Sequence, residues 1–324
     1  MYSYGDILYF LYVLQIMIGI LGNVLVLYLY SFHLITGYKT RPIDLIIINL
    51  TFSNILTILF RGVPWAIQLL QVKFFLDNIG CKTLIYLQRT SRSLTLCSNC
   101  FLSVFQTITI SSCNIRWAEL RIRAPKYIIS CCILIWIFSQ LLSVPLFSSV
   151  TGVKNNSNSN QSRNLGICSL NRYTRPTSAF ISWKSLYEGV FVSVMVISSG
   201  YMIFVLYRHH QQVQHTLGTS LTPRASPEIR ATKTILLMLS IFLYFYSVSF
   251  IFIIYMDNFQ DTKQWMLHIC VLLTLCYPSF IPYVLISSDS QISNSCYLFQ
   301  RMKKSCPCPS TSQNKHHKAL QLQS

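Results

Sequence analysis

Charge is what this sequence lacks most. Of its 324 residues, 11% are charged and only nine are acidic, whereas 52% are hydrophobic. An ordinary soluble domain carries about 25% charged residues, so the polar surface that would cover soluble domains of this length is missing. With a mean hydropathy of +0.45, the chain is predicted to be an integral membrane protein.

Features of several functional classes are also missing. No lysine lies between Gln264 and Ile286, in the last apolar segment, which excludes a retinal pump. No glycine-rich phosphate loop, nucleophile–base arrangement or four-ligand metal spacing stands out in the sequence. We therefore expect no enzyme activity, no metal site and no cofactor.

What the sequence does contain is seven apolar segments of about the 20 residues that a helix needs to cross a bilayer. A membrane strand needs only about 10 alternating residues, so these lengths predict helices. We expect an all-α, seven-transmembrane-helix bundle in one membrane domain, residues 1–287, followed by a disordered cytoplasmic tail, residues 288–324. The predicted spans are Ile7–Leu29, Ile43–Leu70, Cys81–Ser112, Tyr127–Phe147, Ser185–Tyr207, Thr234–Tyr255 and Trp265–Ile286.

The basic residues predict the orientation, because cytoplasmic loops carry an excess of lysine and arginine. With the N-terminus outside and the C-terminus inside, 15 of the 26 basic residues fall on the cytoplasmic side and eight on the outer side. Two glycosylation sequons, at Asn155 and Asn160, then lie in an outer loop. Both patterns favour a multi-pass protein with its N-terminus outside the cell.

Cysteines on the predicted outer side indicate a disulfide. Most of the 12 cysteines lie inside the spans, where they serve as small apolar residues. Cys81 and Cys168 are the only two on the outer, oxidising side of the predicted topology, and we expect them to be bonded to each other.

Four charged residues interrupt the spans, namely Arg61, Arg89, Arg92 and Glu188. A charge at the bilayer centre costs about 3 kcal/mol or more, so such residues pair, line a wet cavity or mark a functional site. All four fall in the outer halves of their spans, where three cations meet one carboxylate. Two interpretations stay open: a ligand cavity that includes these four residues and Gln88, or purely structural pairing.

Longer stretches carry a family resemblance. "RPIDLIIINLTFSN", "LSVFQTITISSCNIRWAELRIRAPKYI", "SPEIRATKTILLMLSIFLYFYSVSFIF" and "YPSFIPYVLISSDSQI" together resemble the vomeronasal type-1 receptor family, and they span the predicted helices two to seven. The predicted bundle, its cysteine pair and Gly22-Asn23 resemble the G-protein-coupled receptors in general. The chain departs from the rhodopsin-like pattern in having Phe105-Gln106-Thr107 in place of the acidic-Arg-aromatic triplet, and Asn54 in place of a sodium-binding aspartate.

The resemblance implies a chemosensory receptor in the plasma membrane. It would bind a small pheromone-like ligand and activate a heterotrimeric G protein of the inhibitory type. Arginine offers a planar donor fork, so we expect Arg89 or Arg92 to contact an anionic or strong acceptor group of the ligand. The inner basic residues expected to contact the G protein are Arg116, Arg121, Arg123, Lys126, Arg230 and Lys233.

Two alternatives are weaker. A membrane transporter or channel would need a charged path across the whole bilayer, whereas the buried charges here gather in one half. A bitter-taste-like receptor is the nearest rival within the receptor class, and the "SPEIRAT" and "FQTITIS" stretches argue against it.

Overall fold

The structure is a computed structural model of the whole chain. It describes residues 4–36, 41–70, 78–111, 115–144, 150–151, 162–164, 169–171, 175–216, 227–258 and 264–288. The described helices all belong to one compact unit, Met1–Ser288. The predicted tail begins at residue 288, but Ser288 is still helical, and the tail from residue 289 onward lies outside the described residues.

Within the described ranges, seven helices are long and apolar enough to cross a membrane, which confirms the predicted all-α fold. The second span consists of three consecutive pieces, α2, η1 and α3. Three strands of two or three residues, β1 (Val150–Thr151), β2 (Ser162–Asn164) and β3 (Ser169–Asn171), form a small antiparallel sheet in the order β1-β3-β2. The helices are α1 (Tyr4–Thr36), α2 (Pro42–Thr57), η1 (Ile58–Gly62), α3 (Val63–Leu69), α4 (Asn78–Ile110), α5 (Ile115–Ser143), α6 (Arg175–Thr216), α7 (Pro227–Asn258) and α8 (Gln264–Ser288).

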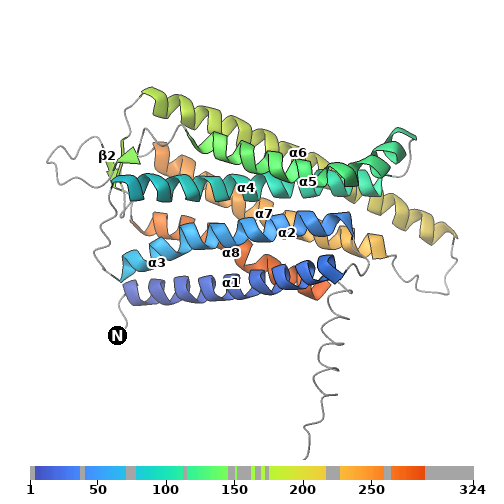
Figure 1. Cartoon of the computed structure of the whole chain (residues 1–324), viewed down its shortest axis with the longest axis horizontal. Helices are drawn as coiled ribbons and strands as arrows, with labels where there is room; N and C mark the ends of the chain where they lie inside the picture. The colour runs from blue at the N-terminus through green and yellow to red at the C-terminus, as the bar shows by residue number, and fades with distance from the viewer. Residues whose placement is uncertain are drawn as a thin grey trace, which may run out of the picture. The chain divides into compact units, whose positions relative to one another are not determined.

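The helices lie side by side, with α4 between α2 on one side and α5 and α6 on the other (Figure 1). Helix α1 packs against α2 and α8, and α8 also packs against α7. Because α4 is surrounded on several sides, its spanning window is the most buried of the seven. Side chains on the inward faces of α4 therefore meet protein rather than lipid.

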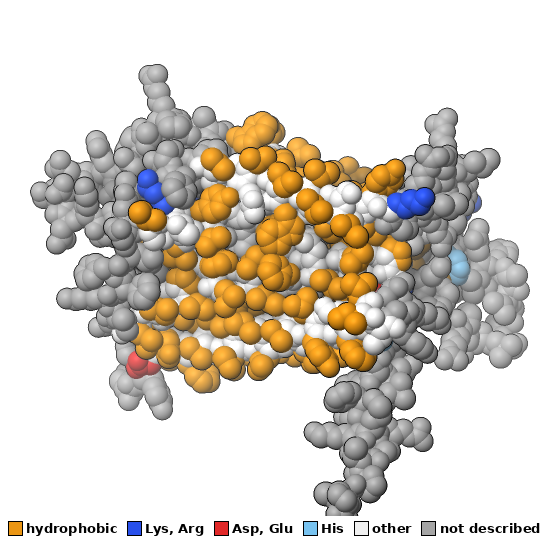
Figure 2. Space-filling model, in the orientation of Figure 1, with side chains coloured by type: hydrophobic (Ala, Val, Ile, Leu, Met, Phe, Trp, Pro, Cys, Tyr) orange, Lys and Arg blue, Asp and Glu red, His pale blue; other side chains and the backbone are white. Residues whose placement is uncertain are grey.

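The outward faces of the helices are apolar. Phe10, Ile129, Ile197 and Ile251 are each more than 60% exposed. Figure 2 shows hydrophobic side chains spread across the visible face, with lysine and arginine side chains near its two ends. A soluble monomer rarely exposes such a continuous apolar surface, so this surface faces lipid and the chain is a multi-pass membrane protein.

Local signals in the sequence explain where the second span begins. Pro42 occupies the first helical position, where its missing N–H costs nothing. The Asp44 carboxylate accepts the Arg41 backbone N–H at 2.9 Å and lies 3.4 Å from the Arg41 Nε. The Arg41 backbone N–H, which would otherwise have no hydrogen-bond partner at the start of the helix, is satisfied in this way.

Polar side chains connect the helices inside the bundle. Asn49 of α2 donates to Ser98 Oγ of α4 at 2.8 Å, and its Oδ1 accepts the Trp136 Nε1–H of α5 at 2.8 Å. Hydrogen bonds of this kind hold membrane helices together because hydrocarbon offers no competing partner. They fix the rotation of α4, and so the direction of its charged residues.

Candidate ligand site beside Arg92

Arg92 of α4 is the centre of the candidate site. It is 8% exposed, and its Nη2 lies 3.9 Å from Oε2 of Glu188, a residue of α6 that is 3% exposed. The guanidinium carbon lies 4.8 Å from the ring centroid of Tyr246 of α7, a cation–π contact. One side chain of α4 thus bridges two neighbouring helices.

The partners of Arg92 are incomplete. A guanidinium has five N–H donors, and a separation of 3.9 Å is too long for a hydrogen bond. Within the part of the chain that the structure describes, neither Nε nor Nη2 of Arg92 has a hydrogen-bond partner. A buried charge is costly unless it is both paired and hydrogen-bonded, so the arrangement leaves room for an acceptor.

Arg92 lines a cavity of about 30 Å³ that lies between α2, α4, α7 and α8. The surface exposed to the cavity is almost wholly apolar, although the lining includes threonine and serine residues, and Arg92 is the one charged residue among those that line it. The lining residues are Thr57, Arg92, Thr95, Phe242, Phe245, Tyr246, Ser249, Thr274, Tyr277 and Pro278. Such a mixture suits a ligand with an apolar body and one acceptor group.

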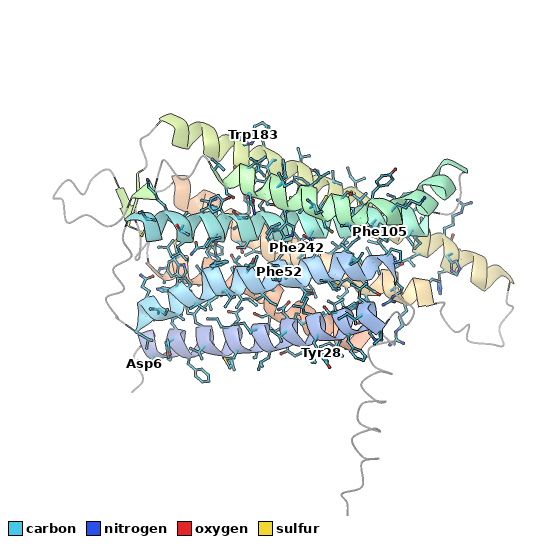
Figure 3. The ribbon with its side chains drawn as sticks, viewed as in Figure 1. Asp6, Tyr28, Phe52, Phe105, Trp183 and Phe242 are labelled. Carbon is cyan, nitrogen blue, oxygen red and sulfur yellow. The ribbon has the colours of Figure 1, made fainter. Side chains whose placement is uncertain are left out.

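A second polar contact lies at this cavity. The Tyr277 hydroxyl of α8 donates to Asn99 Oδ1 of α4 at 2.6 Å, and both residues are buried. The Tyr277 ring packs edge-on against Phe242 of α7, with centroids 4.8 Å apart. Phe242 lies nearer the middle of the helices than Phe105 (Figure 3). Through these two contacts, Tyr277 connects α8 to α4 and to α7 at the border of the cavity.

The other predicted ligand residues lie near the cavity without lining it. Arg61 belongs to η1, and its Nη2 lies 3.9 Å from the Cys270 sulfur of α8. Arg89 is half-buried one turn before Arg92, and the Gln88 carbonyl accepts a hydrogen bond from Ser91 at 3.0 Å.

The structure thus brings Arg92 and Glu188 together and places Arg92 alone of the predicted residues in the cavity wall. Sequence analysis missed Tyr246, Thr57 and Thr95. Threonine and aromatic residues are common in spans, and Thr57 and Thr95 both donate to carbonyls of their own helices. The one available signal for Tyr246 is its position in the aromatic run "FLYFY", residues 242–246.

The remaining predicted sites are only partly described. Cys81 is fully buried and is not among the free cysteines, while Cys168 lies outside the described residues. Asn155 and Asn160 also lie outside them, as do the side chains of Arg116, Arg121 and Arg123 in α5. Lys126, Arg230 and Lys233 are exposed. The disulfide, the sequons and the G-protein surface stay predictions.

Seven membrane-spanning helices enclosing a cavity with one buried cation are the architecture of a seven-helix receptor. The sequence profile of the vomeronasal organ pheromone receptor family matches residues 6–298, and the chain belongs to this family. It is accordingly a G-protein-coupled receptor and not an enzyme.

Individual relatives agree with this assignment. Vomeronasal type-1 receptor 3 of Homo sapiens is 40% identical over 280 residues, which cover 86% of this chain and 89% of the relative. Vomeronasal type-1 receptor 1 of Gorilla gorilla gorilla is 36% identical over 296 residues, covering 91% and 84%. Vomeronasal type-1 receptor 40 of Mus musculus is 32% identical over 282 residues, covering 86% and 89%.

Proposed function

We propose that this protein is a chemosensory receptor of the plasma membrane that binds a small pheromone-like ligand at Arg92. Its N-terminus lies outside the cell, and its inner surface activates a heterotrimeric G protein of the inhibitory type. One observation carries the ligand site: a buried cation with two unpartnered nitrogen atoms among the described residues lines a cavity inside the bundle. The predicted ligand therefore carries an anionic or strong acceptor group.

The cavity is too small for a ligand, so ligand binding requires a change in the conformation of the helix bundle. A volume of about 30 Å³ holds a water molecule or two, whereas small-molecule pockets are roughly ten times larger. A ligand must therefore move apart the walls formed by α4, α7 and α8. It stabilises the expanded arrangement by binding it better than the closed one.

Contacts farther along the same helices connect this expansion to the inner surface. The Gln106 Nε2 of α4 donates to the Thr232 hydroxyl of α7 at 2.8 Å, and both residues are buried. Ser111, the residue that follows α4, and Tyr201 of α6 are hydrogen-bonded at 2.9 Å. Outward movement of α7 would break the first bond and leave the second, so it would open a surface beside Arg230 and Lys233 for the G protein.

The ligand site is tested with a cell-based G-protein dissociation assay against pheromone-like small molecules. For an agonist found in this way, Arg92→Gln should raise the half-maximal concentration at least about tenfold, which corresponds to about 1.4 kcal/mol. Surface expression should be unchanged. Arg89→Gln is the comparison variant, one helical turn away and outside the cavity wall, and should have a smaller effect.

An unchanged response after replacement of both arginines would reject the ligand role and leave structural pairing as their explanation.

A further inference from the structure

Arg92 and Tyr246 hold hydrogen-bond donors that meet no acceptor within the described part of the chain. Nε and Nη2 of Arg92 and the hydroxyl of Tyr246 are buried there without hydrogen-bond partners. Both side chains line the cavity, and the guanidinium carbon of Arg92 lies 4.8 Å from the centroid of the Tyr246 ring. A buried donor without a partner is unfavourable, so this wall favours an occupant that brings an acceptor.

Most other hydroxyl groups of the lining already donate hydrogen bonds. Thr57, Thr95 and Thr274 each donate to a carbonyl of their own helix, at 3.0, 3.1 and 2.7 Å. The Tyr277 hydroxyl donates to Asn99 Oδ1 at 2.6 Å. The surface exposed to the cavity is almost wholly apolar. Polar recognition of a ligand there therefore depends on Arg92 and Tyr246.

The charge beside Arg92 makes a neutral acceptor fit better than an anion. The Glu188 carboxylate already places a negative charge 3.9 Å from the Arg92 Nη2. A carboxylate on the ligand would repel Glu188, and it would have to leave water for an almost wholly apolar cavity, which is costly for an ion. A neutral carbonyl oxygen has two lone pairs. One such oxygen can accept from Arg92 and from Tyr246 without burying another charge.

We infer that this receptor selects a neutral, largely apolar ligand with one carbonyl-type oxygen, which Arg92 and the Tyr246 hydroxyl bind together. The inference rests on the proposed ligand site at Arg92, narrows the acceptor group of the ligand to a neutral one, and adds Tyr246 as a second binding residue. Phe242 and Phe245 also line the cavity, so the apolar body of the ligand packs against aromatic rings.

The test compares the affinities of matched probes for the purified full-length receptor without G protein. Each set contains a ketone, a hydrocarbon of nearly the same shape and a carboxylate of similar size. The sets are acetophenone, ethylbenzene and benzoate, and benzophenone, diphenylmethane and diphenylacetate. The rise of the thermal unfolding midpoint with probe concentration gives each apparent affinity. In at least one set, the ketone should bind at least about tenfold tighter than both other probes, because it alone supplies a neutral acceptor to the buried donors.

Substitutions identify the two binding residues. Tyr246→Phe removes only the hydroxyl, so it should weaken ketone binding about threefold to tenfold and leave hydrocarbon binding unchanged. It should not lower the midpoint of the probe-free receptor, because that hydroxyl has no described partner to lose. Arg92→Lys keeps a charge beside Glu188 but lacks Nε, and should reduce the preference for the ketone at least about threefold. Tyr244→Phe is the matched control, since Tyr244 is exposed on the same helix, and should respond like the wild type.

Equal affinities of ketone and hydrocarbon in both sets would overturn the inference. A full preference for the ketone in Tyr246→Phe would remove Tyr246 from the site. If the carboxylates bind tightest and lose affinity in Arg92→Gln, the neutral ligand class is wrong, while the ligand site of the proposed function stands. A receptor that binds ketones through both residues but activates no G protein would contradict only the proposed signalling.

Discussion

Pro282 has no backbone N–H, and Asn23 provides the donor that is missing as a result. In a regular helix, residue 282 would donate to the carbonyl of Pro278, four positions earlier. Lipid offers no water as a substitute. The Asn23 Nδ2 of α1 instead donates to Pro278 O at 2.7 Å and to Gly19 O of its own helix at 2.7 Å. One asparagine thereby joins α1 to α8.

Replacing Asn23 by leucine should lower the free energy of unfolding by about 1 to 3 kcal/mol, because the buried Pro278 carbonyl loses this donor. The thermal unfolding midpoint of the purified receptor measures the loss. Ser193→Ala is the matched control, since that exposed hydroxyl donates to Gly189 of its own helix, at 2.8 Å. Equal losses in the two variants would show that the link between α1 and α8 is not what Asn23 contributes.

The charged residues of the site can be predicted from the sequence, but which of them contact one another cannot. Arg92 and Glu188 stand out because charges are so rare in the spans. Arg89 and Arg92 lie one turn apart, so either could reach Glu188, and the choice depends on how α4 and α6 are rotated. That rotation is fixed by packing between distant segments, such as the bonds of Asn49 to Ser98 and Trp136. The same packing brings Tyr246 to Arg92.

At the scale of elements, the second span is not one regular helix. Its turn η1, Ile58–Gly62, is a π-helix in which Val63 N–H bonds to Ile58 O, five residues back. Pro64 follows, and a proline cannot donate to the carbonyl four positions earlier. Single π turns inside helices often lie at functional sites, and this one carries Arg61. Hydropathy predicts the span but not the π turn. A π turn changes which backbone groups are hydrogen-bonded, whereas hydropathy depends only on how apolar the residues are.

Glycine sets the distance between α1 and α8. A Cβ on Gly22 would lie 2.9 Å from Pro282 Cβ and 3.0 Å from the Tyr283 ring. Gly22→Ala should therefore lower the free energy of unfolding by about 1 to 3 kcal/mol, because the two helices must move apart. The thermal unfolding midpoint is again the measurement.

Gly200→Ala in α6 is the control for this substitution, since nothing lies within 4 Å of its added Cβ. Alanine is the better helix former, so this variant should match or exceed the wild type by up to about 1 kcal/mol. Destabilisation by both substitutions would contradict the packing argument.

At the scale of the whole molecule, the number of helices follows from hydropathy, while their lengths do not. Helix α6 runs from Arg175 to Thr216 and α5 begins at Ile115, well beyond the apolar segments that predict them. Figure 1 shows α6 continuing past its neighbours at the end of the bundle opposite the strands. A helix continues into water wherever its polar residues form helix well, and hydropathy detects only the part in lipid.

The inner basic surface leads to a prediction about signalling. Neutralising Arg121 and Arg123 while keeping Lys126 should lower agonist-stimulated G-protein activation at an unchanged surface level, because these charges are proposed to contact the G protein. The measurement is G-protein dissociation in cells, normalised to surface receptor. If the substitutions change only topology or expression, the residues serve to orient the chain under the positive-inside rule.

The most direct test of the account is agonist-stimulated nucleotide exchange on a purified inhibitory-type G protein by the purified receptor. Reconstitution removes trafficking and expression from the comparison. Agonist should accelerate exchange with the wild type, and an equal amount of folded Arg92→Gln receptor should need at least about tenfold more agonist. Equal potency of the two receptors, or no acceleration by an agonist that binds the wild type, would contradict it.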